Sequence, residues 1–346
     1  MLVIAAPGQG AQTPGFLVPW LELPGFADRL TAWSELAGCD LIKAGTVADA
    51  DQIRDTAVAQ PLLVAAAIAA AEALAGQHVP LKGLSAMVAG HSVGELAAGA
   101  IAGVISPEDA MRLVRVRADG MAAAAAATAT GMTALLGGKG PEVLAALDAH
   151  GLTPANINAA GQIVAAGTLE QLAALAADPP AGARLRPLSV AGAFHTSHMA
   201  PAVEALVAAA AQVPVSDPVL PLLSNRDGQA VDSGADWLER IVAQVSSPVR
   251  WDSCMAEMAA RGATALIELP PAGTLAGLAR RALPGIQRVS LIKPDDLEAA
   301  RALLAEAADN PQAADRTQAD HPGAAEHTDH PGDPGPRPRP ESDRGE

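Results

Sequence analysis

Residues 86–95 read Ala86-Met87-Val88-Ala89-Gly90-His91-Ser92-Val93-Gly94-Glu95, and this stretch decides the fold. Its first four residues are apolar and predict a buried strand, whereas the Leu- and Ala-rich residues after Gly94 predict a helix. Between them lies Gly-x-Ser-x-Gly, the sequence of a sharp strand-to-helix turn that exposes a serine hydroxyl. Gly90 and Gly94 leave room for a strained backbone at Ser92, and a helix N-terminus favours negative charge beside it. The stretch predicts a nucleophilic Ser92; the alternative is a surface turn that matches the pattern by chance.

Short apolar runs alternate with amphipathic stretches along the rest of the chain. We expect strands at 2–6, 86–90, 132–136, 163–166, 185–190, 219–223, 264–268 and 288–292. We expect helices at 61–76, 94–103, 107–126, 141–149, 169–176, 199–212, 249–260, 274–282 and 295–308. Strands that alternate with helices indicate an α/β fold with a largely parallel sheet.

Two features predict a smaller unit inserted into this fold. The run from Met121 to Thr130 is nearly all Ala and ends in Thr-Ala-Thr-Gly, as a helix end followed by a hinge would. Residues 131–192 then read strand–helix–strand–strand–helix–strand, a compact α+β pattern, and the main pattern resumes near Phe194. From Asn310 the chain is rich in Pro, Asp, Gly and His, and it predicts a disordered tail because almost nothing apolar remains to bury.

Composition excludes several classes of protein. The 346 residues carry a net charge of −15, which argues against nucleic-acid binding, although a local basic patch could still dock an acidic protein. Cys39 and Cys254 form no CxxC pair, so we expect neither a disulfide scaffold nor a cysteine-rich zinc site. The first residues predict a strand rather than a signal peptide, and the most apolar helix contains Glu72. We therefore expect a cytoplasmic protein with no membrane span.

A serine hydroxyl needs a base that takes its proton, and the chain has eight histidines. Five lie in the tail, after a helix or in the inserted unit: His321, His327, His330, His78 and His150. His91 precedes the serine in the turn, where we expect its side chain to point away. His195 and His198 remain, between a strand and a helix, where an open α/β sheet places its site. Spacing alone does not choose between them, and a capping or surface histidine is the alternative for either.

The segment Pro7-Gly8-Gln9-Gly10-Ala11-Gln12 follows the first predicted strand. Its two glycines form a tight loop that could aim N–H groups at a ligand, or simply a turn. Serine acyl-transfer enzymes take one oxyanion donor from the N–H after the nucleophile and another from an early strand–helix loop. Val93 and Gln9 fit these two roles.

Four segments, in this order and spacing, resemble those of malonyl-CoA:acyl carrier protein transacylases. They are Gly8-Gln9-Gly10-Ala11-Gln12, Gly90-His91-Ser92-Val93-Gly94-Glu95, Val116-Arg117-Ala118-Asp119-Gly120-Met121 and Gly192-Ala193-Phe194-His195. The resemblance implies an α/β-hydrolase-like core, residues 1–124 and 193–308, interrupted by a ferredoxin-like subdomain, 125–192, with the acidic tail 309–346 outside it. It also implies transfer of a malonyl group from malonyl-CoA to holo acyl carrier protein through a malonyl-serine, with no metal and no redox cofactor.

The resemblance also implies roles for individual residues. Ser92 would be the nucleophile and His195 the base, since His198 stands where the family often has an apolar residue. The main-chain carbonyl of Gln244 would orient the His195 ring, and the N–H groups of Gln9 and Val93 would form the oxyanion hole.

Arg117 would clamp the malonyl carboxylate, because a planar guanidinium accepts a carboxylate through two parallel hydrogen bonds. The alternative is a surface arginine, which we expect of Arg112 and Arg115 on the same helix. Asn158 and Gln162 resemble the family's Asn-x-x-x-Gln stretch near the cleft and would have a supporting role. The loop Glu268-Leu269-Pro270-Pro271-Ala272-Gly273 departs from the Gly-Pro of many members.

Phe194, next to His195, leaves little room for an α-methyl branch on the acyl group. Relatives that take methylmalonyl groups tend to have Ser before this His and Gln after the nucleophile, so malonyl is the predicted substrate. An esterase or thioesterase is one alternative; it would need an acidic residue such as Asp148 or Asp178 and would have no use for Arg117. A non-catalytic carrier-protein docking module is another. An acyltransferase of polyketide synthesis would share the chemistry predicted here for fatty acid synthesis.

Overall fold

The first strand, β1 (Leu2–Ala6), lies inside the larger sheet of the computed structural model, which describes residues 1–309. Leu2, Ile4 and Ala6 belong to one hydrophobic cluster, whereas Val3 and Ala5 belong to another. Successive side chains of a strand point to opposite faces of the sheet. The alternation therefore means that apolar helices cover both faces, as they must when parallel strands are buried.

The larger sheet has six strands in the order β10-β9-β1-β2-β7-β8, of which only β8 is antiparallel to its neighbour. The other strands are β2 (Ala86–Gly90), β7 (Leu222–Leu223), β8 (Ala230–Val231), β9 (Ala265–Glu268) and β10 (Gln287–Ser290). This arrangement confirms the predicted α/β fold with a largely parallel sheet.

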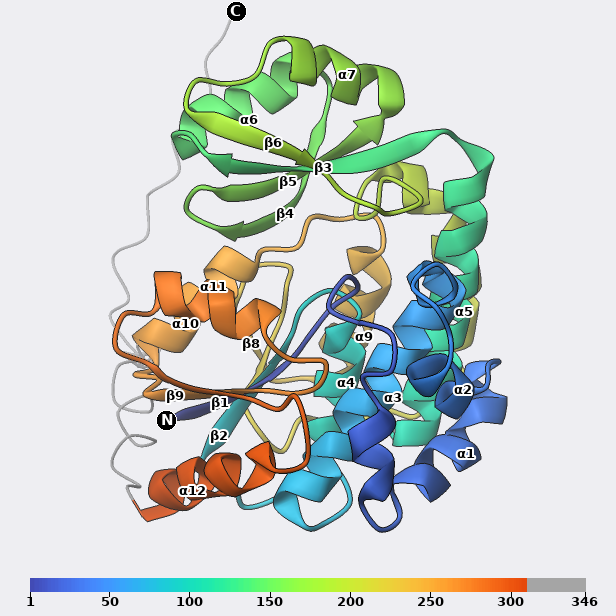
Figure 1. Ribbon diagram of the computed structural model, residues 1–346, viewed down its shortest axis with the longest axis vertical. Helices are drawn as coiled ribbons and strands as arrows, with labels where there is room; N and C mark the ends of the chain where they lie inside the picture. The colour runs from blue at the N-terminus through green and yellow to red at the C-terminus, as the bar shows by residue number, and fades with distance from the viewer. Residues whose placement is uncertain (310–346) are drawn as a thin grey trace, which may run out of the picture.

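Helices cover the two faces of this sheet (Figure 1). One face is covered by α10 (Trp251–Ala260) and α11 (Thr274–Ala282). The other cluster takes its side chains from α1 (Phe26–Ala37), α2 (Leu41–Thr46), α3 (Thr56–Ala75), α4 (Gly94–Ile101), α5 (Pro107–Ala127), α8 (Val203–Ala210), α9 (Gly234–Gln244) and α12 (Asp296–Asp309). Short 3-10 helices lie at Val18–Glu22, Gln52–Arg54 and Ser197–Ala202.

Helix α3 is the central apolar helix of the larger cluster. It begins before the predicted start at residue 61, because the Asp55 side chain accepts the N–H of Ala57 and caps it. Pro61 lies within the helix and removes one hydrogen bond without ending it. By length and composition α3 could cross a membrane, but 83% of its most apolar stretch is buried inside the protein.

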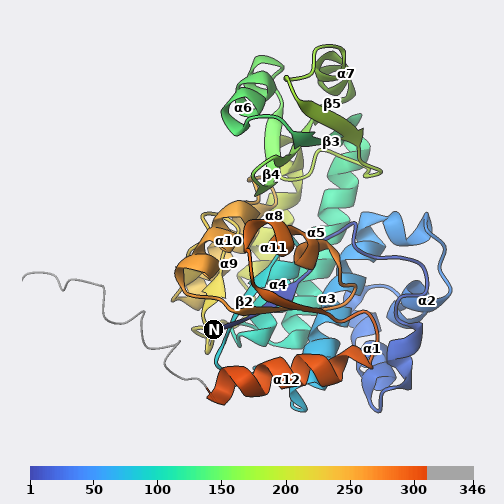
Figure 2. The same cartoon turned by 60° about the vertical axis from the view of Figure 1, so that its left-hand side comes forward.

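A separate antiparallel sheet lies above the larger part, in the order β4-β5-β3-β6 (Figures 1 and 2). Its elements are β3 (Thr130–Gly137), α6 (Gly140–Ala149), β4 (Thr153–Ala159), β5 (Gln162–Thr168), α7 (Leu169–Ala177) and β6 (Ala183–Pro187). Leu135 packs with Leu147 and Leu175 of the two helices, whereas Met132 and Val164 join the cluster of the larger part. The order predicted for 131–192 is thus confirmed.

Two connections hold the smaller sheet over the larger one. Helix α5 runs up from the larger part and leads directly into β3 (Figure 2). Edge strand β4 also pairs with Val249, since Ile157 N–H donates to Val249 O and Val249 N–H donates to Ala155 O, both at 2.9 Å. The boundaries at 124/125 and 192/193 stay predictions. Apart from Asp309, which ends α12, the tail 309–346 lies outside the described residues.

Several predicted elements were wrong or missing. The predicted order of 131–192 includes a strand at the place of β4, but no bounds were predicted for it, because Asn and Pro are rare in strands. Helices α1, α2 and α9 were also missed, and Ser233 caps α9 at the end of a polar run that looked like a loop. The helix expected at 199–212 starts as a 3-10 helix that contains Pro201.

Leu63→Ala should lower the free energy of unfolding by about 2–5 kcal/mol, because it leaves a cavity under a side chain that is 1% exposed. Val47→Ala, at a side chain that is 75% exposed, should change it by less than about 0.5 kcal/mol. Denaturant unfolding of both variants measures the difference. Equal losses would contradict a core position for α3.

Candidate active site

The turn between β2 and α4 holds Ser92 in a left-handed backbone conformation, with φ 53°. This region is unfavourable for residues that carry a Cβ, so the surrounding turn must impose it. A Cβ on Gly90 would lie 2.0 Å from the carbonyl carbon of Gly94, and one on Gly94 would lie 2.3 Å from Ala6 O. The turn therefore closes only with glycine at both positions, and it raises the serine side chain into a pocket.

Asn225, which follows β7, binds the turn from below and is fully buried. Its Oδ1 accepts the N–H of Ser92 at 2.7 Å, and its Nδ2 donates to Gly90 O at 2.7 Å. Its own N–H donates to Glu95 Oε1 at 3.1 Å. One side chain thus satisfies two main-chain groups of the turn, the N–H of the strained serine and the carbonyl oxygen of Gly90.

Ser92 Oγ lies 2.7 Å from Nε2 of His195, which is itself left-handed with φ 61°. His195 Nδ1 lies 2.8 Å from the main-chain oxygen of Gln244. A carbonyl oxygen can only accept, so Nδ1 carries the ring proton and Nε2 has the free lone pair. Nε2 can therefore accept the proton of the Ser92 hydroxyl.

Burial and, after it, the nearby charge of Arg117 lower the pKa of His195 to about 3, although the hydrogen bond to the Gln244 carbonyl acts in the opposite direction. The ring is consequently neutral at physiological pH. A neutral imidazole in this tautomer is the form that a general base requires.

Arg117 projects from α5 and is 1% exposed. Its Nη2 donates to Gln244 Oε1 at 2.9 Å and lies 3.3 Å from Ser92 Oγ, and its Nη1 donates to Gln60 Oε1 at 2.5 Å. Burial lowers the pKa of Arg117 to about 10, which still leaves it charged at neutral pH. Within residues 1–309 no carboxylate pairs with this guanidinium, and neutral amides hold it.

Two N–H groups near Ser92 have no protein acceptor among the described residues: those of Gln9 and Val93. Val93 stands at the N-terminus of α4, where the helix dipole favours negative charge. Gln9 lies in the loop after β1, and its side chain donates to Thr56 Oγ1 at 3.2 Å. Both can donate to an oxyanion.

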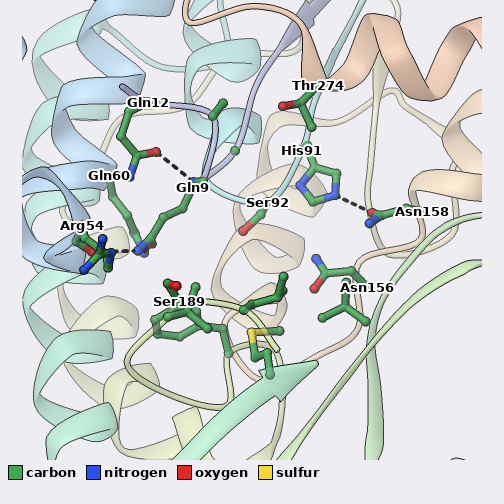
Figure 3. A pocket seen from close by; sticks show the side chains of 18 of the residues that line it. Gln9, Gln12, Arg54, Gln60, His91, Ser92, Asn156, Asn158, Ser189 and Thr274 are labelled. Carbon is green, nitrogen blue, oxygen red and sulfur yellow. Dashed lines mark hydrogen bonds between the residues drawn. The ribbon is translucent and has the colours of Figure 1, made fainter. Parts of the chain in front are cut away.

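The pocket above Ser92 has a volume of about 430 Å³ and is lined by loops and helices of the larger part and by strands of the smaller sheet. Figure 3 shows Ser92 between Gln9 and Gln60 on one side and His91 and Asn158 on the other. Phe194, Met121, Met132 and Val190 give the pocket apolar walls. The space suits a mostly apolar ligand with a few fixed polar contacts.

Comparisons with known proteins identify the family. The acyl transferase domain family matches residues 5–307. The malonyl CoA-acyl carrier protein transacylase of Mycobacterium tuberculosis strain H37Rv is 53% identical over 298 residues, covering 86% of this chain and 98% of the relative. That of Mycolicibacterium smegmatis is 54% identical over 289 residues, covering 82% and 98%. This chain belongs to the malonyl CoA-acyl carrier protein transacylase family.

Solved structures of transacylases have the same fold. The crystal structure of MCAT from Mycobacterium tuberculosis matches with a TM-score of 0.84 at 52% identity, covering 87% of this chain and 99% of that chain. A malonyl-transacylase in complex with its type II PKS acyl-carrier protein matches with a TM-score of 0.80 at 27% identity, covering 87% and 99%. Like its relatives, this transacylase is an acyltransferase.

The transacylase fold brings together the residues that the sequence nominated from distant segments. Ser92, His195, Arg117 and Gln244 are joined by hydrogen bonds. Gln9, Phe194, Asn158 and Gln162 line the pocket, and Val93 adjoins Ser92. Their chemical roles stay predictions.

The other histidines of the transacylase pocket region do not reach the serine hydroxyl. The His91 ring turns towards the smaller sheet, where Nε2 lies 2.9 Å from Asn158 Oδ1, and it packs edge-on against Trp251. His198 is half-buried in the 3-10 helix. Gln162 Oε1 accepts from Arg281 Nη2 at 2.7 Å at the rim. In residues 1–309 no group of three or more His, Cys, Asp or Glu could hold a metal ion.

The loop that departs from the family pattern has its own support. The carboxylate of Glu268 is buried and accepts the N–H groups of Gly273, Leu275 and Ala276, each at 2.8 Å. It therefore caps the N-terminus of α11, a helix that lines the pocket with Leu275. The loop is fixed by a carboxylate cap.

Sequence reasoning missed four residues of the site: Asn225, Glu95, Gln60 and Asn156. Asn225 had a usable signal, since it follows an apolar strand of an α/β sheet, where such folds place polar site residues. Asn156 lies in strand β4, whose bounds were not predicted, and lines the pocket. Glu95 and Gln60 had no such signal, because a polar residue on a helix looks the same in sequence whether it faces solvent or a site.

The low pKa of His195 predicts an unusual pH profile. Ser92 labelling by a neutral fluorophosphonate should fall less than about threefold from about pH 7.5 to about pH 5, since the ring stays neutral well above a pKa of about 3. A histidine with the ordinary pKa near 6.5 would lose about 30-fold at pH 5. Intact-mass kinetics measure the rate, and a loss of that size would contradict the burial effect.

Proposed function

We propose that this chain transfers a malonyl group from malonyl-CoA to the phosphopantetheine thiol of holo acyl carrier protein, through a malonyl ester of Ser92, and so supplies fatty acid synthesis. One observation carries the proposal: Arg117, a buried cation that pairs with no carboxylate of residues 1–309, lies 3.3 Å from the Ser92 hydroxyl. When a serine next to such a cation is acylated, the cation favours an acyl group that carries its own carboxylate. The names of the relatives support the same substrate and partner.

In the first half-reaction, His195 Nε2 takes the proton of Ser92, and Oγ attacks the thioester carbonyl carbon. The carbonyl oxygen becomes an oxyanion and accepts from the N–H groups of Gln9 and Val93. When the intermediate collapses, the carbon–sulfur bond breaks and the coenzyme A sulfur leaves with the proton from His195. The malonyl ester of Ser92 remains.

In the second half-reaction, the carrier-protein thiol enters the place that coenzyme A has left. His195 takes the thiol proton, and the sulfur attacks the ester carbonyl. The same two N–H groups stabilise the second oxyanion. The carbon–oxygen bond then breaks, and Ser92 Oγ recovers its proton from His195, which restores the enzyme for a new cycle.

Arg117 selects the acyl group because a buried carboxylate without a partner costs several kcal/mol. Gln60 and Gln244 hold the guanidinium by amide oxygens, which orient it without cancelling its charge. An acyl group that lacks a carboxylate leaves the cation unpaired, so it binds less well.

An esterase or thioesterase is less well supported than a transferase. Such a triad would need a carboxylate beside His195 Nδ1, where this chain has the carbonyl oxygen of Gln244. The sequence candidates Asp148 and Asp178 are exposed on α6 and after α7. Transfer within polyketide synthesis has one supporting relative, and the carrier protein that accepts the malonyl group would distinguish it.

Intact-mass spectrometry of the chain mixed with malonyl-CoA tests the proposal directly. We expect one malonyl adduct, its loss in Ser92→Ala, and its transfer to added holo acyl carrier protein. Rapid release of free malonate without an accumulated adduct or transfer would favour a hydrolase instead.

Arg117→Ala should lower kcat/KM for malonyl-CoA by roughly 100- to 1,000-fold, the loss of a charge-assisted pair of hydrogen bonds. The kcat/KM for acetyl-CoA should fall far less, because acetyl-CoA has no carboxylate for Arg117 to bind. Arg112→Ala is the matched control, because Arg112 is exposed on the same helix, and both rates should be unchanged. If Arg117→Ala lowered kcat/KM equally for the two thioesters, Arg117 would not be the residue that binds the malonyl carboxylate.

Phe194→Ser should loosen selectivity, because Phe194 is 6% exposed and narrows the pocket near the attacked carbonyl. We expect the preference for malonyl over methylmalonyl, the ratio of their kcat/KM values expressed as a free energy, to fall by about 1–3 kcal/mol. This is the usual contribution of a methylene-scale fit. Competition between the two thioesters, followed by mass spectrometry of the acyl-enzyme, measures the ratio. No change would sink this explanation of selectivity.

A further inference from the structure

The side-chain amide of Gln244 lies between two buried groups of opposite charge. Its Oε1 accepts from Arg117 Nη2 at 2.9 Å, and its Nε2 donates to Glu95 Oε2 in a short hydrogen bond. Nε2 also lies 3.3 Å from Ser92 O. The same residue holds His195 through its main-chain oxygen, so its side chain and its main chain serve different parts of the site.

Glu95 stands in the first turn of α4 and is 2% exposed. Its two oxygens accept from two donors, the main-chain N–H of Asn225 and the amide of Gln244. Burial raises the pKa of Glu95 to about 8, while these two hydrogen bonds and the charge of Arg117 act in the opposite direction. The mechanism proposed above gives this carboxyl group no part in bond making.

We propose that Glu95 is a positioning residue that sets the orientation of the Gln244 amide, so that an oxygen rather than an NH2 group faces Arg117. This rests on the proposed function, in which Arg117 holds the carboxylate of the acyl group.

The argument is one of donors and acceptors. An amide has an oxygen at one end and an NH2 at the other, and the two ends have nearly the same shape. The guanidinium of Arg117 can only donate, so only the oxygen end of Gln244 can face it. Both oxygens of Glu95 accept from N–H donors, so these contacts fit its ionised form, which offers acceptors alone and attracts the NH2 end of Gln244.

In its ionised form Glu95 also places a negative charge close to Arg117 without contacting it. A carboxylate bonded directly to the guanidinium would compete with the carboxylate of the substrate. One amide between Glu95 and Arg117 transmits orientation and leaves Nη2 of the cation 3.3 Å from Ser92 Oγ.

Glu95→Gln tests the proposal because it keeps the shape and replaces one acceptor by a donor. The N–H of Asn225 belongs to the main chain and cannot turn, so the new oxygen must face it and the new NH2 must face Gln244. Gln244 then turns its oxygen to residue 95 and its NH2 to Arg117, where two donors meet. The guanidinium must move.

Two rates separate this effect from a general loss of structure. The ratio of Ser92 acylation by malonyl-CoA to that by acetyl-CoA should fall about 10- to 100-fold, the effect of one unsatisfied hydrogen bond to a charged group. Labelling of Ser92 by a neutral fluorophosphonate should stay within about threefold of wild type, because the main-chain oxygen that holds His195 does not move with the amide. Damage to the fold would lower both rates together and would overturn the proposal.

Glu72→Gln is the matched control. Glu72 is another buried carboxylate, 7% exposed, and it lies away from the site. Its Oε1 is 2.5 Å from Nη2 of Arg29. We expect a lower Tm and an unchanged ratio. A ratio that falls equally in Glu72→Gln and Glu95→Gln would mean that any lost buried carboxylate has this effect, against the proposal.

Gln244→Met is a second route to the same test if Glu95→Gln does not fold. It removes the amide and keeps the main-chain oxygen, so the ratio should fall, and adding Glu95→Gln should lower it no further. An unchanged ratio in Gln244→Met, or additive losses in the double variant, would overturn the proposal.

A crystal structure of Glu95→Gln gives a readout that does not depend on turnover. We expect the guanidinium of Arg117 to have left Gln244, and an unmoved contact would contradict the role of Glu95. A wild-type chain that takes up no malonyl group would contradict the proposed function instead, and the crystal structure would still show whether Arg117 has left Gln244.

Discussion

A buried guanidinium held by neutral amides is the constraint on which the rest of this site depends. Arg117 is almost fully buried and still charged, and its partners Gln60 and Gln244 supply oxygen acceptors without negative charge. A cation in low dielectric acts strongly on its surroundings. It helps to keep His195 neutral, and it lies 3.3 Å from the Ser92 hydroxyl, where the proposed function places the carboxylate of the acyl group.

The fold supports this cation from several directions at once. Helix α5 supplies Arg117, the turn before α4 supplies Ser92, and the C-terminal end of α9 supplies Gln244. All of them meet near the carboxyl end of β2, where a parallel sheet leaves room for a site. The smaller sheet closes the space from above, and its edge strand β4 is tied to Val249, five residues after Gln244. The segment 244–249 thus contacts both the His195 ring, through Gln244 O, and the strand β4 that lines the pocket, through Val249.

Backbone strain is concentrated at the two residues proposed to react. Ser92 and His195 are the only non-glycine residues of 1–309 with positive φ. Such conformations persist only where the surroundings impose them. At Ser92 the surroundings are two glycines without room for a Cβ and the buried Asn225, whose side chain bonds Gly90 O and Ser92 N–H. The conformation of Ser92 is therefore imposed both by the neighbouring glycines and by the side chain of Asn225, which is distant in sequence.

The sequence by itself determined the strand–turn–helix around Ser92, the α/β class and the strand–helix order of the smaller unit, because these depend on periodicity and on glycines a few residues apart. It left His195 and His198 equivalent until the family resemblance separated them. It contained no sign that Glu95 belongs to the site, and for Asn225 it offered only a position after an apolar strand. Only the tertiary structure decided those points, since hydrogen bonds between residues more than a hundred positions apart have no local pattern. Which end of the Gln244 amide faces Arg117 is the clearest case: it depends on a carboxylate from another helix, and donors and acceptors can be matched only after the chain has folded.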